Sequence, residues 1–298
     1  MDILGFGACA VDDLLYVDEF PARDGKTRVQ ERRREGGGLA ATALVAAARL
    51  GANVAWCGVL GSDEASRFSL DELKRESVDV SRVQFQAEAR PHYSVIIVER
   101  SSGSRSILAC NEGVMPFPVE QVNEDLIRGC KVLFVDHTVV ETAICAANLA
   151  RSFSIPVVAD IERIVDGLDE LLPLVGHLIV GVDAARLLSG ESDAENAARI
   201  LSAGREIAVV TDGASGCWFC ENGKTVRHQA AFKVDVVDTT GCGDVFHGAY
   251  LACLARGENL EDSVRFASAV AAIKATKQGG RSGIPNRVQV EEFLEKYA

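Results

Sequence analysis

The chain has 298 residues, 48% of them hydrophobic and 25% charged, which are values of an ordinary globular protein. Its formal net charge of −12 argues against nucleic-acid binding, because proteins that bind nucleic acids carry a basic surface. No apolar run approaches about 18 residues, so a membrane span is not expected. The N-terminal MDILGFGACAVDD starts with an acid rather than a basic segment and predicts a strand, not a signal peptide.

The nine cysteines are an odd number, spread mostly singly along the chain. Only Cys217 and Cys220 have CxxC spacing, within a strand-like CWFC beside an Asn-Gly turn. Because no second CxxC and no neighbouring His pair accompany them, we interpret the cysteines as reduced thiols of a cytoplasmic protein rather than as metal ligands.

Apolar runs of strand length alternate with helical patterns along the chain. The strand-like runs are 3–8, 53–61, 131–137, 155–161, 177–182 and 207–213, and the clearest helical patterns are 39–51 and 261–276. Strands that are apolar on both faces and alternate with helices predict an α/β fold. Such a fold has a mainly parallel central sheet with helices on both faces.

Two segments break this rhythm. Residues 14–35 alternate polar and apolar side chains and contain a Pro and an Asp-Gly turn, and residues 87–110 read as an antiparallel hairpin in which RSSGS joins HYSVIIVE to RSILAC. They form either a decorated edge of the main sheet or a small β lid over the carboxyl ends of its strands, where α/β proteins bind ligands. Both segments would be insertions in one domain of residues 1–298.

The stretch DTTGCGDVFHGA, residues 238–249, follows FKVDVV, which reads as a strand, and runs into a helical pattern. Gly241 and Gly243 permit a tight turn, so that the amides of Gly241, Cys242 and Gly243 can bind an anion at the helix start. Asp244 follows directly. An acid beside an anion pocket suits phosphoryl transfer to a hydroxyl, in which the acid accepts the hydroxyl proton. The alternative is a plain capping turn.

Three further features have a functional and a structural interpretation. The glycines at 36–38 precede an Ala-rich helix, either for close ligand contact or as a flexible joint. Asp12, at the end of the first expected strand, is placed to bind ligand hydroxyls or to cap a turn. The stretch VVTDGASG, residues 209–216, suits a nucleotide phosphate or ribose, or is an ordinary turn between strand and helix.

Together these motifs resemble the PfkB carbohydrate-kinase (ribokinase-like) family over nearly the whole chain. Its C-terminal DTxGAGD signature appears as DTTGCGD, with Cys242 for Ala, and its N-terminal signature as GGGLAATALVAAARLG. The resemblance implies a lid-bearing α/β kinase that uses ATP and Mg²⁺ to phosphorylate a primary hydroxyl of a sugar. It also implies a possible K⁺ site and, by analogy, a homodimer through the lid.

The resemblance implies roles for individual residues. It implies Asp244 as the catalytic base, with an anion hole at Gly241, Cys242 and Gly243. Sugar contacts are implied at Asp12, Gly36, Gly37, Gly38 and Thr42, and nucleotide contacts at Thr211, Asp212, Gly213, Gly216 and Ser268. A monovalent cation is implied at Asp238 and Thr240. Three positions depart from the family pattern: Thr42 replaces a common Asn, Gly283 replaces a possible cation ligand, and the NxxE motif that orders Mg²⁺ reads GVDA, leaving Asp183 as the nearby carboxylate.

Within the family, these segments look very like bacterial sulfofructose kinases, whose sulfonate is held by a Lys, an Asn and an Arg. Lys26 matches the Lys, Asn111 lies near the Asn, and Thr138 stands where the Arg is expected. A neutral or phosphorylated ketose or a ribose-like sugar is the other expectation. Alternatives are a nucleoside or vitamin-alcohol kinase, and a non-catalytic sugar or nucleotide sensor, which would not need Asp244.

Overall fold

The computed structural model describes residues 1–102 and 104–297. Its main sheet has eight strands in the order β14-β13-β12-β11-β10-β9-β1-β4. Six of them, β1, β4 and β9 to β12, are parallel to one another. Strand β13 is antiparallel to β12, and β14 is antiparallel to β13. Their bounds are β1 Ile3–Phe6, β4 Val54–Cys57, β9 Val132–Asp136, β10 Val157–Asp160, β11 His177–Gly181, β12 Ile207–Thr211, β13 Cys217–Glu221 and β14 Arg227–Gln229. The mainly parallel central sheet expected from the sequence is confirmed.

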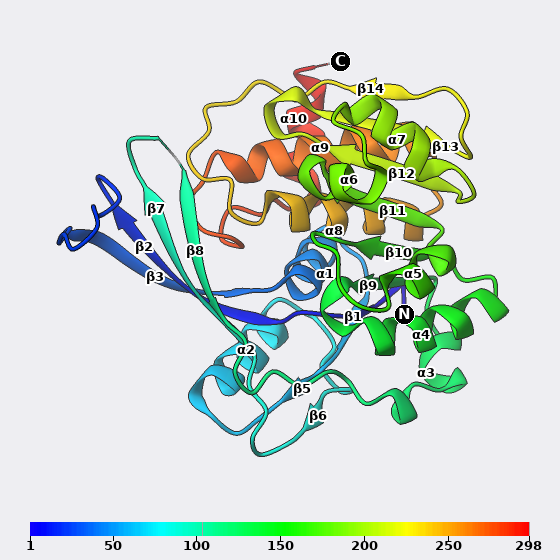
Figure 1. Ribbon diagram of the computed structural model, residues 1–298, viewed down its shortest axis with the longest axis horizontal. Coiled ribbons are helices and arrows are strands. Elements are labelled where there is room, and N and C mark those ends of the chain that lie inside the picture. Colours follow the sequence, from blue (N-terminus) through cyan, green and yellow to red (C-terminus); the bar gives the residue numbers. More distant parts are fainter. Residues whose placement is uncertain (103, 298) are drawn as a thin grey trace.

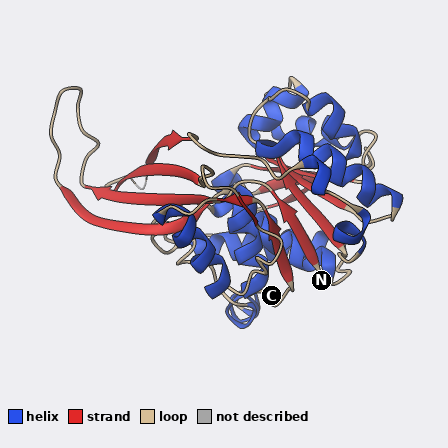
Figure 2. Ribbon diagram, turned by 90° about the horizontal axis from the view of Figure 1, so that it is seen from below, coloured by secondary structure: helices blue, strands red, loops and turns tan. Residues whose placement is uncertain are grey.

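Helices cover both faces of this sheet, as Figure 2 shows. One face is packed by α1 (Leu39–Arg49), α8 (Cys242–Ala255), α9 (Leu260–Ala275) and α10 (Arg287–Glu295), and the other by α3 (Glu124–Arg128), α4 (Val140–Ser152), α5 (Leu168–Leu171), α6 (Val182–Ser189) and α7 (Ala194–Ser202). Each face has its own hydrophobic core. Helices α1 and α8 approach closely because Gly248 lies against Ala43 and Ala46, where a Cβ would clash.

A second sheet of four strands, in the order β3-β2-β7-β8, projects from the main body (Figure 1). Its strands are β2 Ala10–Val17, β3 Val29–Gly37, β7 His92–Glu99 and β8 Arg105–Cys110. It is a separate sheet, not an edge of the main one, and we call it the lid. The antiparallel pairing of β7 with β8 confirms the hairpin, although Gly103 in the RSSGS turn lies outside the described residues.

The remaining elements are short. Strands β5 (Val59–Leu60) and β6 (Gln84–Phe85) pair with each other, and α2 (Glu64–Arg75) lies between them in the chain. None of the helices in the described part of the chain is long and apolar enough to cross a membrane.

Two sequence predictions are wrong. The apolar run FKVDVV, residues 232–237, is not a strand; two of its valines, Val236 and Val237, are exposed, and the run lines a cleft instead of joining the main sheet. Asp12 does not end the first strand, which stops at Phe6; it is the third residue of β2, the first strand of the lid. Gly7 makes the turn between the two strands at a φ of 148°.

Candidate active site

The GCG turn starts helix α8 at the carboxyl edge of the main sheet. Gly241 is the N-cap residue at φ 72°, in the left-handed region that favours glycine. The Cys242 amide already donates to the Thr239 carbonyl at 3.2 Å. The Gly243 amide has no acceptor in the described part of the chain, and nothing lies within 4 Å of where a Gly243 Cβ would be. The space for an anion therefore opens at Gly243, while Cys242 closes the turn.

Asp244 lies in the first turn of α8 and is only partly exposed. Burial is the main cause that raises its pKa well above the usual range, and the nearby carboxylates of Asp160 and Glu162 raise it further. The positive charge of Arg281 acts in the opposite direction. An aspartate with a raised pKa is a stronger proton acceptor once ionised, which is what a general base requires.

Asp12 is carried toward the same site by lid strand β2. Burial raises its pKa to about 6, and the Arg281 guanidinium limits this rise. Its carboxylate crosses directly over Gly37, because a Cβ there would lie 2.0 Å from Asp12 Oδ2. A hydrogen bond with Ser94 on β7 also favours the ionised form of this side chain.

The Gly36–Gly38 run makes room for side chains and for a turn. A Cβ on Gly36 would lie 2.2 Å from Arg281 Nη1, and Gly38 takes φ 90° with the Ala8 carbonyl 2.5 Å from its Cβ position. These glycines therefore let Asp12 and Arg281 reach the site across the end of β3. Neither sequence interpretation, ligand contact or flexible joint, included this role.

Arg281 is the site residue that sequence reasoning missed. It is 3% exposed; its Nε donates to Thr42 Oγ1 at 3.1 Å, and its Nη2 donates to the Gly37 carbonyl at 2.6 Å. Its Nη1 is buried with no partner among the described residues. A buried guanidinium group with one free N–H edge is prepared to bind an oxygen of a ligand. Because it comes from a loop remote in sequence from Asp12, its burial beside Asp12 was not predicted.

The same loop is fastened to the lid. Glu35 on β3 accepts hydrogen bonds from the Arg281 amide at 3.0 Å and from Ser282 Oγ at 2.9 Å. On β2, Tyr16 donates from its hydroxyl to Asp238 Oδ2 at 3.2 Å. Lid strands β2 and β3 thus contact both the C-terminal loop and the segment that leads into the GCG turn.

The three residues matched to a sulfonate site come from three separate segments of the chain. Lys26 is exposed on the loop between β2 and β3, beyond the turn at Asp24. Asn111 Oδ1 lies 2.9 Å from His92 Nδ1, and Thr138 donates from its amide to Asp136 Oδ1 at 2.8 Å.

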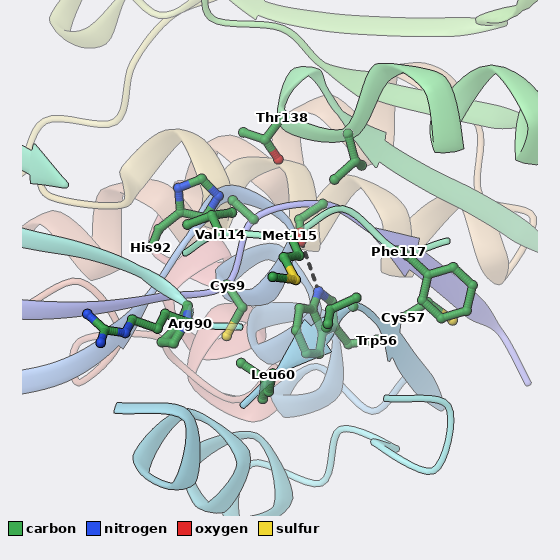
Figure 3. A pocket seen from close by; sticks show the side chains of 16 residues that line it. Cys9, Trp56, Cys57, Leu60, Arg90, His92, Val114, Met115, Phe117 and Thr138 are labelled. Atoms are coloured by element: carbon green, nitrogen blue, oxygen red, sulfur yellow. Dashed lines mark hydrogen bonds between the residues drawn. The ribbon is translucent and has the colours of Figure 1, made fainter. Parts of the chain in front are cut away.

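A small cavity lies beside Thr138 and His92, with Cys9 and Trp56 among its walls (Figure 3). Its volume is about 20 Å³, enough for about one water molecule and far too small for a sugar. Trp56 Nε1 donates to the Gly7 carbonyl at 3.1 Å on its floor. The cavity adjoins the turn between β1 and β2, whose residues Gly7, Ala8 and Cys9 line it.

A cleft of about 770 Å³ opens on the other side of the GCG turn. Four of the residues expected to contact nucleotide line it, namely Thr211, Gly213, Gly216 and Ser268, together with Phe232, Val236, Cys242, Gly243 and Phe246. Asp212 lies between two of them and does not line the cleft itself. The volume lies in the range of small-molecule sites, and its walls are mainly apolar, as an adenine ring requires.

Carboxylates collect where β9 and β10 end. Asp136 and Asp160 are the last residues of these neighbouring strands, and Glu162 follows two residues later. Burial raises the pKa of both Asp160 and Glu162. Asp183, the carboxylate left in the degenerate NxxE position, is instead 91% exposed and is paired with Arg186 at 3.0 Å.

Comparison with known proteins decides the family. The model of the pfkB family carbohydrate kinases matches residues 2–287. The chain belongs to this family. It is 29% identical to a ribokinase of Haemophilus influenzae, with 97% of both chains covered. A putative ribokinase from Agrobacterium tumefaciens has the same fold with a TM-score of 0.93, 29% identity and 99% and 98% of the two chains covered.

A further solved structure shows the fold alone, because it is 21% identical. It is Arabidopsis thaliana ribokinase complexed with ribose and ATP, with a TM-score of 0.83 and 99% and 98% of the chains covered. The chain is therefore a ribokinase-like, ATP-dependent sugar kinase, and kinases of this type use ATP together with Mg²⁺.

Proposed function

We propose that this kinase transfers the γ-phosphoryl group of ATP to a primary hydroxyl of a ribose-like sugar or a ketose. The observation that carries the proposal is the convergence of Asp12, Asp244 and Arg281, whose charges shift one another's pKa, beside an open turn at Gly243. Asp12 and Arg281 bind sugar hydroxyls, and Asp244 accepts the proton of the attacking hydroxyl. The relatives named ribokinase support ribose as the first sugar to test.

The nucleotide binds in the cleft beside Thr211 and Ser268, and its phosphates run toward Gly243. There the free amide and the dipole of α8 stabilise charge that develops on the transferring group. Placing the acceptor hydroxyl between Asp244 and this amide orients it for in-line attack. The base and the anion hole then act on opposite sides of one reacting centre.

Mg²⁺ is expected with the nucleotide. Within the described residues no cluster of three or more His, Cys, Asp or Glu side chains would hold a metal ion by itself. Mg²⁺ usually binds through one or two carboxylates plus substrate phosphates. We assign those carboxylates to Asp160 and Glu162 and not to the exposed Asp183. Burial disfavours the negative charge of Asp160 and Glu162, and a cation bound beside them would offset that cost. The ion would offset the negative charge that the phosphates bring.

The lid suggests a dimer. On β8, Leu108 is 62% exposed, and it lies opposite Val95 of β7 on one face of the sheet. Exposed apolar residues on a sheet that ends in an open edge strand favour pairing with a second chain. We propose that two lids pack through this face.

The nine free cysteines agree with a reducing, cytoplasmic location.

The test is ADP release measured with ribose, fructose, sulfofructose, nucleosides and vitamin alcohols at equal concentration. A preference for ribose or a ketose supports the proposal. A preference for a nucleoside or a vitamin alcohol would replace the substrate class, and sugar binding without ADP release in any case would identify a sensor. Mass spectrometry of the product would show whether the phosphate is on a primary hydroxyl.

A further inference from the structure

Lys274, in the last turn of α9, is a fully buried lysine. Its side chain is 0% exposed, and its Nζ donates to the Asp238 carbonyl at 2.9 Å. Lysine is almost never buried completely unless its charge is paired, because removing an ammonium group from water is costly. A buried positive charge at this position therefore requires a partner of opposite charge.

That partner is the segment beginning at Asp238. The Asp238 carboxylate, 1% exposed, accepts hydrogen bonds from the amides of Thr240 at 2.8 Å and Gly279 at 2.9 Å. Burial would raise its pKa, but the bonds from Thr240 and Gly279 and the Lys274 charge hold the pKa below the usual value. Burial lowers the pKa of Lys274, and the nearby Asp238 carboxylate opposes this change.

Asp238 and Thr240 are the residues for which the family resemblance implies a monovalent cation, and K⁺ does not fit them here. The Lys274 ammonium already contacts the Asp238 backbone, and a second cation beside it would be repelled strongly in a buried site. Gly283 offers no side-chain ligand, and a Cβ there would lie only 2.9 Å from the Lys274 carbonyl.

One group favours a cation. Thr240 Oγ1 is buried and has no partner among the described residues. A single hydroxyl group is one ligand, whereas an ammonium group offers three donors and one full charge at a fixed place. The balance of contacts favours the lysine over an added ion.

We propose that Lys274 is a built-in replacement for the monovalent cation, and that this kinase therefore works without K⁺; the inference rests on the proposed function. Lys274 is a positioning residue. It neutralises Asp238, whose carboxylate holds the Thr240 amide and so the start of the GCG turn. The free amide of Gly243 is then held in place whatever the ionic composition of the solution.

The first experiment uses the unmodified protein in KCl, NaCl and choline chloride at equal ionic strength. We measure the melting temperature and the affinity for a fluorescent ADP analogue, neither of which requires a known sugar, and then turnover with the best sugar. All three quantities should be the same in the three salts. A saturable increase in nucleotide affinity or melting temperature with K⁺ alone would overturn the proposal.

The second experiment compares Lys274→Ala, which leaves room for a cation, with Lys274→Met, which fills much of the space without charge. In choline chloride both should bind the ADP analogue about 10-fold or more weakly, as expected when one partner of a buried charge pair is lost. K⁺, ammonium or ethylammonium should restore Lys274→Ala but not Lys274→Met. Lys277→Met, which removes an exposed lysine three residues away, is the control and should be unchanged.

These results separate the two levels of the proposal. If Lys274→Ala folds with the circular dichroism spectrum of the parent but no cation restores its nucleotide affinity, Lys274 does not replace a cation. If Lys274→Ala fails to fold, the salt comparison with the parent protein and the Lys274→Met variant still test whether Lys274 replaces the cation. If the salts have no effect and no sugar is phosphorylated, the proposed substrate class fails while the inference on Lys274 stands.

Discussion

Gly37→Ala tests whether the glycine run exists to let Asp12 reach the sugar. The added Cβ would lie 2.0 Å from Asp12 Oδ2 and 2.6 Å from its Cγ, whereas ordinary contact begins near 3.4 Å. The carboxylate must therefore move by the difference between 2.0 and 3.4 Å, about 1.4 Å. Gly37 has no positive φ, so alanine brings no backbone strain that would confuse the result.

The size of the effect follows from that displacement. A misplacement of about 1 Å can cost roughly 100-fold in rate. This corresponds to about 2.7 kcal/mol of transition-state stabilisation. It is also about what one or two lost charge-assisted hydrogen bonds are worth, at roughly 1.5–3 kcal/mol each. We therefore expect kcat/KM for the sugar to fall about 100-fold with little change in the KM for ATP.

Steady-state ADP release with each substrate varied in turn measures both constants. Gly129→Ala is the matched control, because φ there is −81° and nothing lies within 4 Å of its Cβ position. It should leave both constants unchanged. If Gly37→Ala keeps the sugar kcat/KM of the parent, or changes the KM for sugar and ATP equally, then Asp12 does not bind the sugar and our placement of the sugar site is wrong.

Three further predictions concern the same site. Asp244→Asn should retain the ADP-analogue affinity but lower kcat by about 100-fold or more, the loss expected for a positioned base; near-normal turnover would remove Asp244 from the mechanism. The pKa of Asp12 is raised to about 6, so it is ionised above that pH and protonated below it; the sugar KM should rise as the pH falls through about 6, and Asp12→Asn should flatten that rise, which a KM profile from pH 5 to 8 would check. Lys26→Ala should weaken an anionic sugar much more than its neutral analogue if Lys26 contacts the anion; a preference for ribose or fructose together with a silent Lys26→Ala would exclude the sulfosugar.

The sequence predicted the fold well because its signals are local. The apolar runs that became β9 to β12 each lie next to one another in the main sheet, and the Gly241 turn is set by the φ that only glycine adopts easily. The run FKVDVV has the same apolar character, yet it lies outside the sheet and lines the cleft in which we propose that the nucleotide binds. Apolar content alone does not distinguish a strand from the wall of a cleft.

The candidate site was predicted only in part, because several of its contacts join distant segments. Arg281 and Lys274 look like ordinary basic residues in the sequence, and their burial appears only when the C-terminal loop folds against Gly37 and Asp238. Likewise, Glu162 gains its importance from Asp244, which is remote in the chain. The sequence signal for the replacement of the monovalent cation by Lys274 was the absence of a side chain at Gly283.

The contacts that hold the lid to the main body couple the binding of the two substrates. Tyr16 and Glu35 tie lid strands β2 and β3 to Asp238 and to the Arg281 loop. A lid that closes on sugar would therefore move the segment that also bounds the cleft proposed for the nucleotide. The two affinities are then coupled, and by linkage the coupling is reciprocal. We expect sugar to tighten ADP-analogue binding and ADP to tighten sugar binding by the same factor, measurable by calorimetry. In Tyr16→Phe that factor should approach one, although each substrate still has its own binding residues in place.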